Sequence, residues 1–514
     1  MRQGRGLLAA KVVVAAIAVW APGRSAARAE DAPAGDVAAD RAPFQARVDA
    51  AIDAGVAWLR GIQRDDGTFR LEPGSPIAGR PVRGDLPQGD PSQDWPGGPW
   101  DKGLDALCVY TLAACDVPVD DPALERGFDA LRRHWRGREP GDDALRRRGA
   151  GDGISTYFVA CCLLALDARH NRGVTALGKG APPRSQRATV PVGATDSAWA
   201  AELVAWLVDA QDDGRTPRNA RPLDGWRRPQ PKDSDATATT PSSTPTLAEG
   251  GGFGYDRSDI SWSYHDHSNS QFALLGLKSG ARLGVAIDDA VWLRSLRHFI
   301  AAQAKEGPEV PRVDARGAAS ASRATSDAAG PTDHARGWAY SCAGSRFDPA
   351  RNLGARPDVA EWGPSMTAGG VSSLVICRSE LDGARVFDAG TAALTETAIR
   401  DGLAWLALDL DALTTAPSGP AARRRNDGLD DFYFLYGLER ACVLAGVTRV
   451  GACDWWFTGA ERILERQEES GAFRSRSIGY GNGRREIDTC FALLFLRRAV
   501  FRVPDATTTT PSSK

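Results

Sequence analysis

The sequence predicts an all-α fold built from six pairs of helices. Segments with one apolar stripe at helical spacing alternate along the chain with segments that are apolar on nearly every side. A spacing of glutamine, glycine and an aromatic residue recurs after several of the striped segments. The alternation occurs about six times, and units that each bury one face against their neighbours form either an open solenoid or a closed ring. The widely varying loop lengths favour a closed ring with insertions at its rims.

The N-terminus has the pattern of a secretory signal. Arg2 and Arg5 precede an apolar run over residues 7–21, and small residues surround position 28. We expect a signal peptide over residues 1–29 that is cleaved near Ala29, which predicts a secreted or periplasmic protein. The alternative is an uncleaved signal that anchors the protein in the membrane. No other apolar run reaches the roughly 20 residues that a membrane span needs. We therefore expect no transmembrane span in the mature chain.

The clearest helix pair lies between residues 454 and 496. It begins with an amphipathic helix, continues through a loop that contains Gly471 and Phe473, and ends in a segment, 489–496, that is apolar nearly all round. The stripe of the first helix comprises Trp456, Ala460, Ile463, Leu464 and Gln467. We term the striped helices outer and the uniformly apolar helices inner.

The other elements follow the same alternation after a spacer over residues 30–43. Outer helices are predicted over residues 44–63, 121–135, 197–211, 289–303 and 394–411, and inner helices over 104–114, 154–166, 271–277, 371–381 and 432–444. The helical region as a whole covers residues 44–500. Insertions at 215–250 and 304–336 are predicted to be disordered, and residues 501–514 form a low-complexity tail.

The loops after the outer helices share a residue spacing. Gln63, Gly67 and Phe69 repeat the spacing of Gln467, Gly471 and Phe473 position for position. Partial copies of the spacing occur at Gln303 with Gly307 and at Gln211 with Gly214.

These loops, with Trp58 ahead of the first, resemble the "QW" repeats of squalene-hopene cyclases and related triterpene cyclases. The helix pairs resemble the (α/α)6 toroid that those cyclases share with the β subunits of protein prenyltransferases. Further similar loops lie at 250–255 and 337–341, and the resemblance covers roughly residues 45–500. It implies an (α/α)6 toroid in which the glutamine binds loop backbone and the aromatic residue stacks on the neighbouring turn.

Cyclases of this family protonate their substrate with an aspartate-rich motif at the start of an inner helix, where neighbouring carboxylates keep one acid protonated. Residues 364–368 occupy the place that resembles this motif, and they contain no acid. Asp430 and Asp431, directly before the inner helix at Phe432, are candidate proton donors. The structural alternative is that these residues cap that helix.

The prenyltransferases instead bind zinc through an aspartate, a cysteine and a histidine. Asp488 and Cys490 resemble the first two ligands at the start of the last inner helix. His265 and His267 precede the third inner helix, on the opposite side of a six-membered ring, so we predict no cofactor and keep zinc as an alternative. In the structural alternative Asp488 caps its helix and Cys490 lies in the core. The two histidines, with Asp266 between them, are themselves candidates for proton transfer or metal binding.

The net charge and the positions of the cysteines restrict which partners and which disulfides we expect. A net charge of -2 with 25% charged residues is not typical of a nucleic-acid-binding protein. Most of the nine cysteines lie in apolar helical runs, where cysteine behaves as a small hydrophobe. Cys108 and Cys115 lie seven residues apart on one helix, about 10 Å along its axis, and we predict no disulfide framework.

Two functions remain open from the sequence. The first is a secreted toroid that lacks the cyclase acid motif and acts as a non-catalytic scaffold for an apolar small molecule or a protein partner. The second is an active triterpene cyclase-like or prenyltransferase-like enzyme on isoprenoid substrates, with a divergent acid such as Asp430 or His267. A third toroid, the thioester-containing domain of complement-like proteins, needs a reactive Cys–Gln motif that we do not find.

Overall fold

A computed structural model describes ten stretches of the 514-residue chain. They are residues 34–69, 99–137, 154–171, 192–212, 250–255, 266–312, 331–340, 363–415, 428–475 and 484–498, with backbone alone at 34–42, 99–102 and 411–415. The expected signal peptide, the low-complexity tail, His265 and nearly all of the insertion 215–250 lie outside these stretches.

Internal contacts divide the chain into two units, Met1–Arg47 and Val48–Lys514. Helix α1, Ala34–Gly61, spans the boundary and begins within the segment expected to be a spacer, ahead of the predicted start at residue 44. The described part of the first unit is helical from Ala34 onward. All other described elements belong to the second unit.

The described residues are predominantly helical, which confirms the all-α prediction. The outer helices of the second unit are α3 Pro122–Arg136, α6 Ala194–Ala210, α8 Asp289–Ala302, α11 Ala389–Thr415 and α14 Trp455–Leu464, together with the second half of α1. The inner helices are α2 Pro99–Ala114, α5 Thr156–His170, α7 His267–Arg282, α10 Pro364–Leu381, α13 Phe432–Ala445 and α15 Arg485–Arg497. Among the described helices, none combines the length and the apolar character needed to cross a membrane.

The helix starts follow from short polar side chains in the sequence. In six helices an aspartate or serine before the first turn accepts a hydrogen bond from a backbone N–H of that turn, which satisfies an otherwise unpaired donor. These capping residues are Asp121, Ser155, Asp266, Asp288, Asp431 and Asp454. Outer helix α3 buries the single stripe of Leu124, Phe128, Leu131 and Trp135, whereas inner helix α5 is buried over nearly its whole surface.

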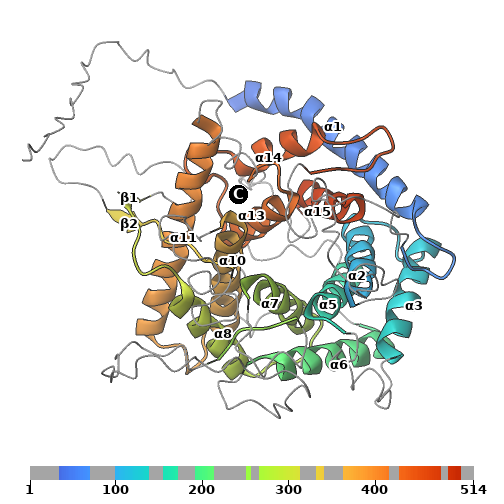
Figure 1. The fold of residues 1–514 in the computed structure, drawn as a ribbon, viewed down its shortest axis with the longest axis horizontal. Helices are drawn as coiled ribbons and strands as arrows, with labels where there is room; N and C mark the ends of the chain where they lie inside the picture. The colour runs from blue at the N-terminus through green and yellow to red at the C-terminus, as the bar shows by residue number, and fades with distance from the viewer. Residues whose placement is uncertain are drawn as a thin grey trace, which may run out of the picture. The chain divides into compact units, whose positions relative to one another are not determined.

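The inner helices make a closed series of contacts. Each contacts the next in the order α2, α5, α7, α10, α13, α15, and α15 contacts α2 (Figure 1). The outer helices pack on this series: α3 contacts α2, α6 contacts α5 and α7, α8 and α11 contact α10, and α14 contacts α13 and α15. Side chains of the inner helices are consequently enclosed by neighbouring inner helices and by the outer layer.

Four glutamines tie one outer helix to the next. Each donates a hydrogen bond from its side-chain amide, with an Nε2–O distance of 2.9 Å, to a backbone carbonyl of the following outer helix. The pairs are Gln63 with Ala123, Gln211 with Val291, Gln303 with Ala398 and Gln467 with Ala51. The last pair joins α14, near the end of the chain, to α1 near its beginning.

Each of these loops also ties an outer helix to an inner one. The residue after the glutamine donates its backbone N–H to the carbonyl that precedes an aromatic residue. The N–O distances are 2.8 Å for Arg64–Thr68, 3.1 Å for Asp212–Gly252, 3.0 Å for Ala304–Gly337 and 2.8 Å for Glu468–Ala472. The N–H of the aromatic residue then donates to an inner-helix side chain: Phe69 to Asp105, Phe253 to Ser270, Trp338 to Thr367 and Phe473 to Thr489. The same hydrogen bonds thus recur at four places.

In the loops of Gln211 and Gln303, the sequence-based assignment of the glycine equivalent to Gly67 is wrong. Gly67, Gly251 and Gly471 have positive φ, and a Cβ on any of them would lie within 2.5 Å of a carbonyl oxygen in the next outer helix. Gly251, not Gly214, therefore matches Gly67 in the loop of Gln211. In the loop of Gln303 the matching residue is Arg336 rather than Gly307, because the insertion enters between the glutamine and the aromatic residue.

The disorder predicted for residues 304–336 is wrong at both ends of that segment. Strand β1, Glu309–Pro311, pairs antiparallel with strand β2, Thr332–His334. Asp333 on β2 is buried and accepts hydrogen bonds from Arg312 and Arg400, so the hairpin is tied to helix α11. Residues 313–330 lie outside the described part of the chain.

Candidate functional site

The two aspartates before α13 are engaged in structural interactions. The carboxylate of Asp431 accepts hydrogen bonds from the backbone N–H of Tyr433, at 2.9 Å, and of Phe434, at 3.3 Å. It is therefore the N-cap of α13, as the structural alternative predicted. Asp430 forms an ion pair with Arg466, whose Nη2 lies 3.3 Å from Oδ1. Both carboxylates are thus engaged in contacts within the fold.

His267 is the first residue of α7 and is fully buried. Its Nδ1 lies 2.5 Å from the carbonyl oxygen of Ala339, and its ring packs against His298 and Phe299 of outer helix α8. The side chain thus joins α7 to the outer layer.

Asp488 and Cys490 face different partners. The Asp488 carboxylate accepts a hydrogen bond of 2.8 Å from the backbone N–H of Ser475, and the helix itself begins after Arg484. Asp488 is therefore not the N-cap, and the expected cap role is corrected to a loop contact. Cys490 lies instead beside Cys108 of α2. In the described part of the chain, no three His, Cys, Asp or Glu side chains are grouped as a metal site.

The start of α10 is the place where the sequence resembles the acid motif. Its first turn contains Pro364, and the hydroxyl of Thr367 accepts the hydrogen bond from Trp338 described above. This position is therefore used to hold a loop aromatic residue.

The structure brings together another set of side chains, which we call the inner cluster: Tyr157, Ser268, Gln271, Tyr433 and Arg440. They come from α5, α7 and α13, three of the inner helices. A continuous run of hydrogen bonds links them, from the Tyr157 hydroxyl to Ser268 at 2.6 Å, Ser268 to Tyr433 at 2.5 Å, Tyr433 to the Gln271 amide at 2.6 Å, and Gln271 to Arg440 at 3.1 Å.

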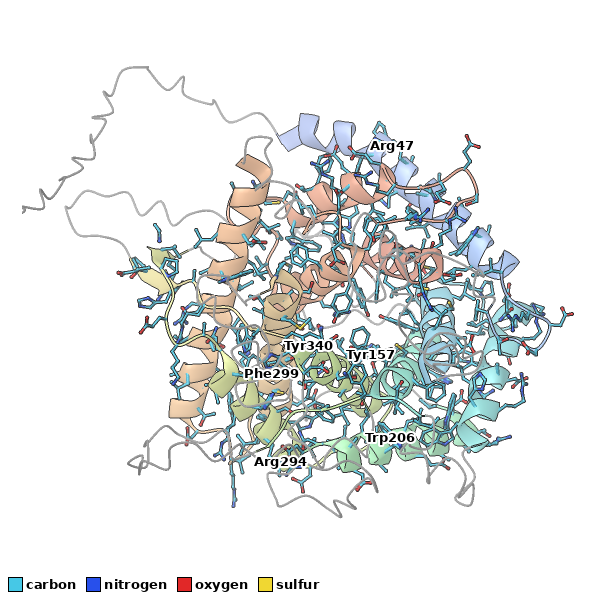
Figure 2. The ribbon with its side chains drawn as sticks, in the orientation of Figure 1. Arg47, Tyr157, Trp206, Arg294, Phe299 and Tyr340 are labelled. Carbon is cyan, nitrogen blue, oxygen red and sulfur yellow. The ribbon has the colours of Figure 1, made fainter. Side chains whose placement is uncertain are left out.

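The inner cluster leads from the half-buried to the fully buried part of the molecule. Tyr157 and Tyr433 are half-buried, whereas Gln271 and Arg440 are buried. Tyr340 and Tyr255, whose hydroxyls lie 2.8 Å apart, extend the half-buried end, and Tyr340 is 38% exposed. Tyr157 and Tyr340 lie beside α7, whereas Trp206 lies on outer helix α6 (Figure 2).

Aromatic rings surround the buried end of the cluster. The guanidinium carbon of Arg440 lies 3.6 Å from the ring centroid of Tyr436 and 5.3 Å from that of Phe272. Phe491 of α15 stacks on Tyr436 with centroids 5.2 Å apart. Such faces attract a cation, and the attraction grows in a desolvated setting.

Arg440 retains hydrogen-bonding capacity in this setting. Its side chain is fully buried, Nη2 donates to Gln271, and Nε and Nη1 have no hydrogen-bond partner among the described residues. Nε and Nη1 together carry three N–H groups. A buried charge with unmade hydrogen bonds is costly, so this position is suited to a further acceptor.

Burial controls the protonation of the tyrosines. It raises the pKa of Tyr436 to about 12, against the opposing effect of the Arg440 charge, and it raises the pKa of Tyr157 and Tyr433 well above the ordinary value. Their hydroxyls are consequently neutral near pH 7 and can both donate and accept hydrogen bonds.

Asp266 is the titratable acid at the half-buried end of the inner cluster. Burial raises its pKa to about 6, although hydrogen bonds from the Asn269 backbone and side chain and from the Tyr340 hydroxyl oppose this shift. Its charge in turn raises the pKa of Tyr157 and Tyr433, which places the carboxyl close to both. Of the sequence segment 265–267, the central residue and not the flanking His267 lies with the cluster.

Comparison with known proteins gives no family assignment. No protein-family model matches the chain, and no curated protein matches it with significance.

Proposed function

We propose that this chain is a secreted or periplasmic (α/α)6 toroid that binds a small molecule without transforming it. The closed series of inner helices, the outer helices packed on it and the four matching glutamine loops support the toroid with QW-like loops. They agree with the resemblance to terpenoid cyclases and protein prenyltransferases, which concerns architecture.

The inner cluster carries the binding proposal. Its hydrogen-bonded side chains lead from the half-buried Tyr157 to the buried Arg440, whose Nε and Nη1 have no partner among the described residues. An acceptor group on a ligand would supply the missing hydrogen bonds, and a charged acceptor would also neutralise the guanidinium. The rings of Phe272, Tyr436 and Phe491 favour an apolar body next to that group. The expected ligand is an apolar molecule with a carboxylate.

The positions of the sequence-predicted acids support binding without chemistry. Asp430 and Asp431 are held by Arg466 and by the start of α13, respectively. Residues 364–368 contain no carboxylate, and Thr367 accepts a loop hydrogen bond. A scaffold needs none of these groups to release a proton.

Binding of dodecanoate, dodecanol and dodecylamine by the full chain tests this proposal, because the three probes share one apolar body and differ in the head group. We expect isothermal titration calorimetry to give at least tenfold tighter binding of dodecanoate than of the other two, since a hydrogen bond to a charged group contributes about 1.5–3 kcal/mol. Arg440→Met should remove this preference.

Arg466→Met is the matched control, because it also removes an arginine but leaves the inner cluster intact. Arg440→Met is expected to fold, since replacing a buried, incompletely paired charge by an apolar side chain of similar length is often tolerated. Equal binding of all three probes, or an unchanged preference in Arg440→Met, would contradict the proposal.

Asp266 favours a second candidate function, an enzyme with a divergent acid. A carboxyl with a pKa of about 6 is partly protonated near neutral pH and lies beside the hydroxyls of the inner cluster. Incubation with squalene distinguishes the two functions by mass spectrometry of the products. A cyclised product that Asp266→Asn abolishes would establish the enzyme; recovery of intact squalene supports the scaffold.

A further inference from the structure

Two buried cysteines meet where the series of inner helices closes. The Sγ atoms of Cys108 on α2 and Cys490 on α15 lie 3.7 Å apart, and both side chains are fully buried. The two residues are 382 positions apart in the sequence and belong to the first and the last inner helix. Both are present as free thiols in this structure.

The separation is that of two thiols in direct contact, in which the Cys490 thiol donates to the Cys108 sulfur. A disulfide has an S–S distance of about 2.05 Å, so the sulfur atoms would have to approach by roughly 1.7 Å. Because α2 and α15 are in direct contact, rotation about the side-chain bonds with a small shift of the helices can supply this approach.

We propose that Cys108 and Cys490 form a disulfide that covalently joins the first inner helix to the last. The bond depends on export to an oxidising compartment, which the N-terminal sequence predicts, and not on the ligand-binding function. It departs from the sequence-based expectation, which compared Cys108 only with Cys115 on the same helix.

The chemistry is thiol–disulfide exchange with a disulfide oxidant, such as a dithiol oxidoreductase or oxidised glutathione. One cysteine loses its proton, its thiolate attacks the oxidant and a mixed disulfide forms. The second thiolate then displaces the oxidant's sulfur; the two cysteines lose two protons and two electrons, and the oxidant becomes two thiols.

The exchange belongs to folding rather than to the finished protein. Burial, together with the neighbouring Cys490 thiol, raises the pKa of Cys108 well above its ordinary value, so the folded thiols seldom form the reactive thiolate. Both cysteines are accessible before α15 docks on α2. Once formed, the bond is shielded from external thiols by the same burial.

Other thiols lie in the neighbourhood and define the competing outcomes. The charge of a Cys490 thiolate influences both Cys115 and Cys161, so each lies near it. A direct sulfur–sulfur contact is observed between Cys490 and Cys108, and it selects this pair. Cys377 on α10 is buried near Lys278 and Glu380 and serves as the matched control.

Peptide mapping of the full chain tests the proposal directly. The protein is exported to the bacterial periplasm or refolded in a mixture of oxidised and reduced glutathione. It is then denatured in urea that contains iodoacetamide to alkylate free thiols, digested without reductant and analysed by mass spectrometry. We expect a peptide pair linked through Cys108 and Cys490 that reductant separates. The proposal would be overturned if both cysteines were recovered in separate, alkylated peptides, or if Cys490 were linked to Cys115 or Cys161.

Thermal unfolding gives an independent measurement. A cross-link across so long a loop restricts the unfolded chain, and its reduction should lower the unfolding midpoint by roughly 3–6 °C. The drop is expected in the wild type and in Cys377→Ala, but not in Cys108→Ala or Cys490→Ala. If either cysteine variant fails to fold, the peptide map of the wild type still decides the pairing.

Discussion

Asp266 combines two roles in one carboxylate. It caps α7 through a hydrogen bond of 2.6 Å from the backbone N–H of Asn269, and it is nearly inaccessible to solvent. The cap favours the charged form, whereas burial favours the neutral form. Burial has the larger effect, because the pKa rises from 3.8 to about 6. The folded protein consequently binds this proton more tightly than the unfolded chain does.

This balance predicts a pH-dependent stability. Since the pKa of Asp266 is higher in the folded state, its contribution to stability is present below about pH 4 and is lost as the pH rises to about 6. Asp266→Asn keeps a cap acceptor and removes the charge. Between pH 4 and pH 7 the wild type should lose about 2–3 kcal/mol of unfolding free energy relative to the variant, measured by urea denaturation.

The exposed cap Asp288→Asn is the matched control for this measurement, because it makes the same substitution at the start of α8. A stability difference between wild type and Asp266→Asn that stays constant from pH 4 to pH 7 would contradict the prediction.

At single residues, features with a local cause are predictable from the sequence, whereas features that arise from tertiary packing are not. The cap Asp431 could be predicted, because an aspartate directly before an apolar helix has a local cause. The inner cluster could not, since Tyr157, Gln271 and Arg440 meet only through the packing of three helices distant in sequence. One signal was available: Arg440, with Glu439 directly before it, is a charged residue within an inner helix whose other residues are mostly apolar.

At the scale of elements, helix positions were predictable because they depend on local periodicity and capping, and every predicted helix has a counterpart. The loop glycines were not, because the insertion after Gln211 carries the matching glycine to position 251. The disorder predicted for the ends of the insertion 304–336 is wrong because it rests on local composition alone. Its polar composition indicates disorder, but Arg312 and Arg400 give the buried Asp333 partners that composition does not reveal.

A buried ion pair between α7 and α10 gives a prediction at this scale. Lys278 and Glu380 are almost completely buried and form a direct salt bridge. Removing one partner leaves an uncompensated charge, so Lys278→Met should lower the unfolding free energy by about 3–5 kcal/mol. The double variant Lys278→Met, Glu380→Leu should recover most of this loss. Denaturant unfolding of the single and double variants measures the coupling, and equal losses in both would contradict it.

At the scale of the whole molecule, the contact between α15 and α2 and the bond from Gln467 to Ala51 join the two ends of the helical region. A unit closed in this way has no terminal helix pair that can separate without breaking contacts on both sides. The second unit should therefore unfold as one cooperative body.

This cooperativity can be measured with the glutamine series. Gln467→Ala removes a hydrogen bond to Ala51, as Gln303→Ala removes one to Ala398. Each should lower the unfolding free energy by about 1–2 kcal/mol and leave a single transition in calorimetry. A separate early transition in Gln467→Ala would show that the C-terminal helices open independently.

The insertions enter the fold at one recurring point, between the residue after a loop glutamine and the residue before the aromatic. There the chain leaves and returns through backbone hydrogen bonds, which join Asp212 to Gly251 and Gly252 in one loop and Ala304 to Gly337 in another. Because the two ends are already held together, extra length adds only a slowly growing entropic penalty. The equivalent positions at Arg64–Thr68 and Glu468–Ala472 are consequently sites at which a foreign domain could be grafted, and through which such a protein could acquire new recognition surfaces during evolution.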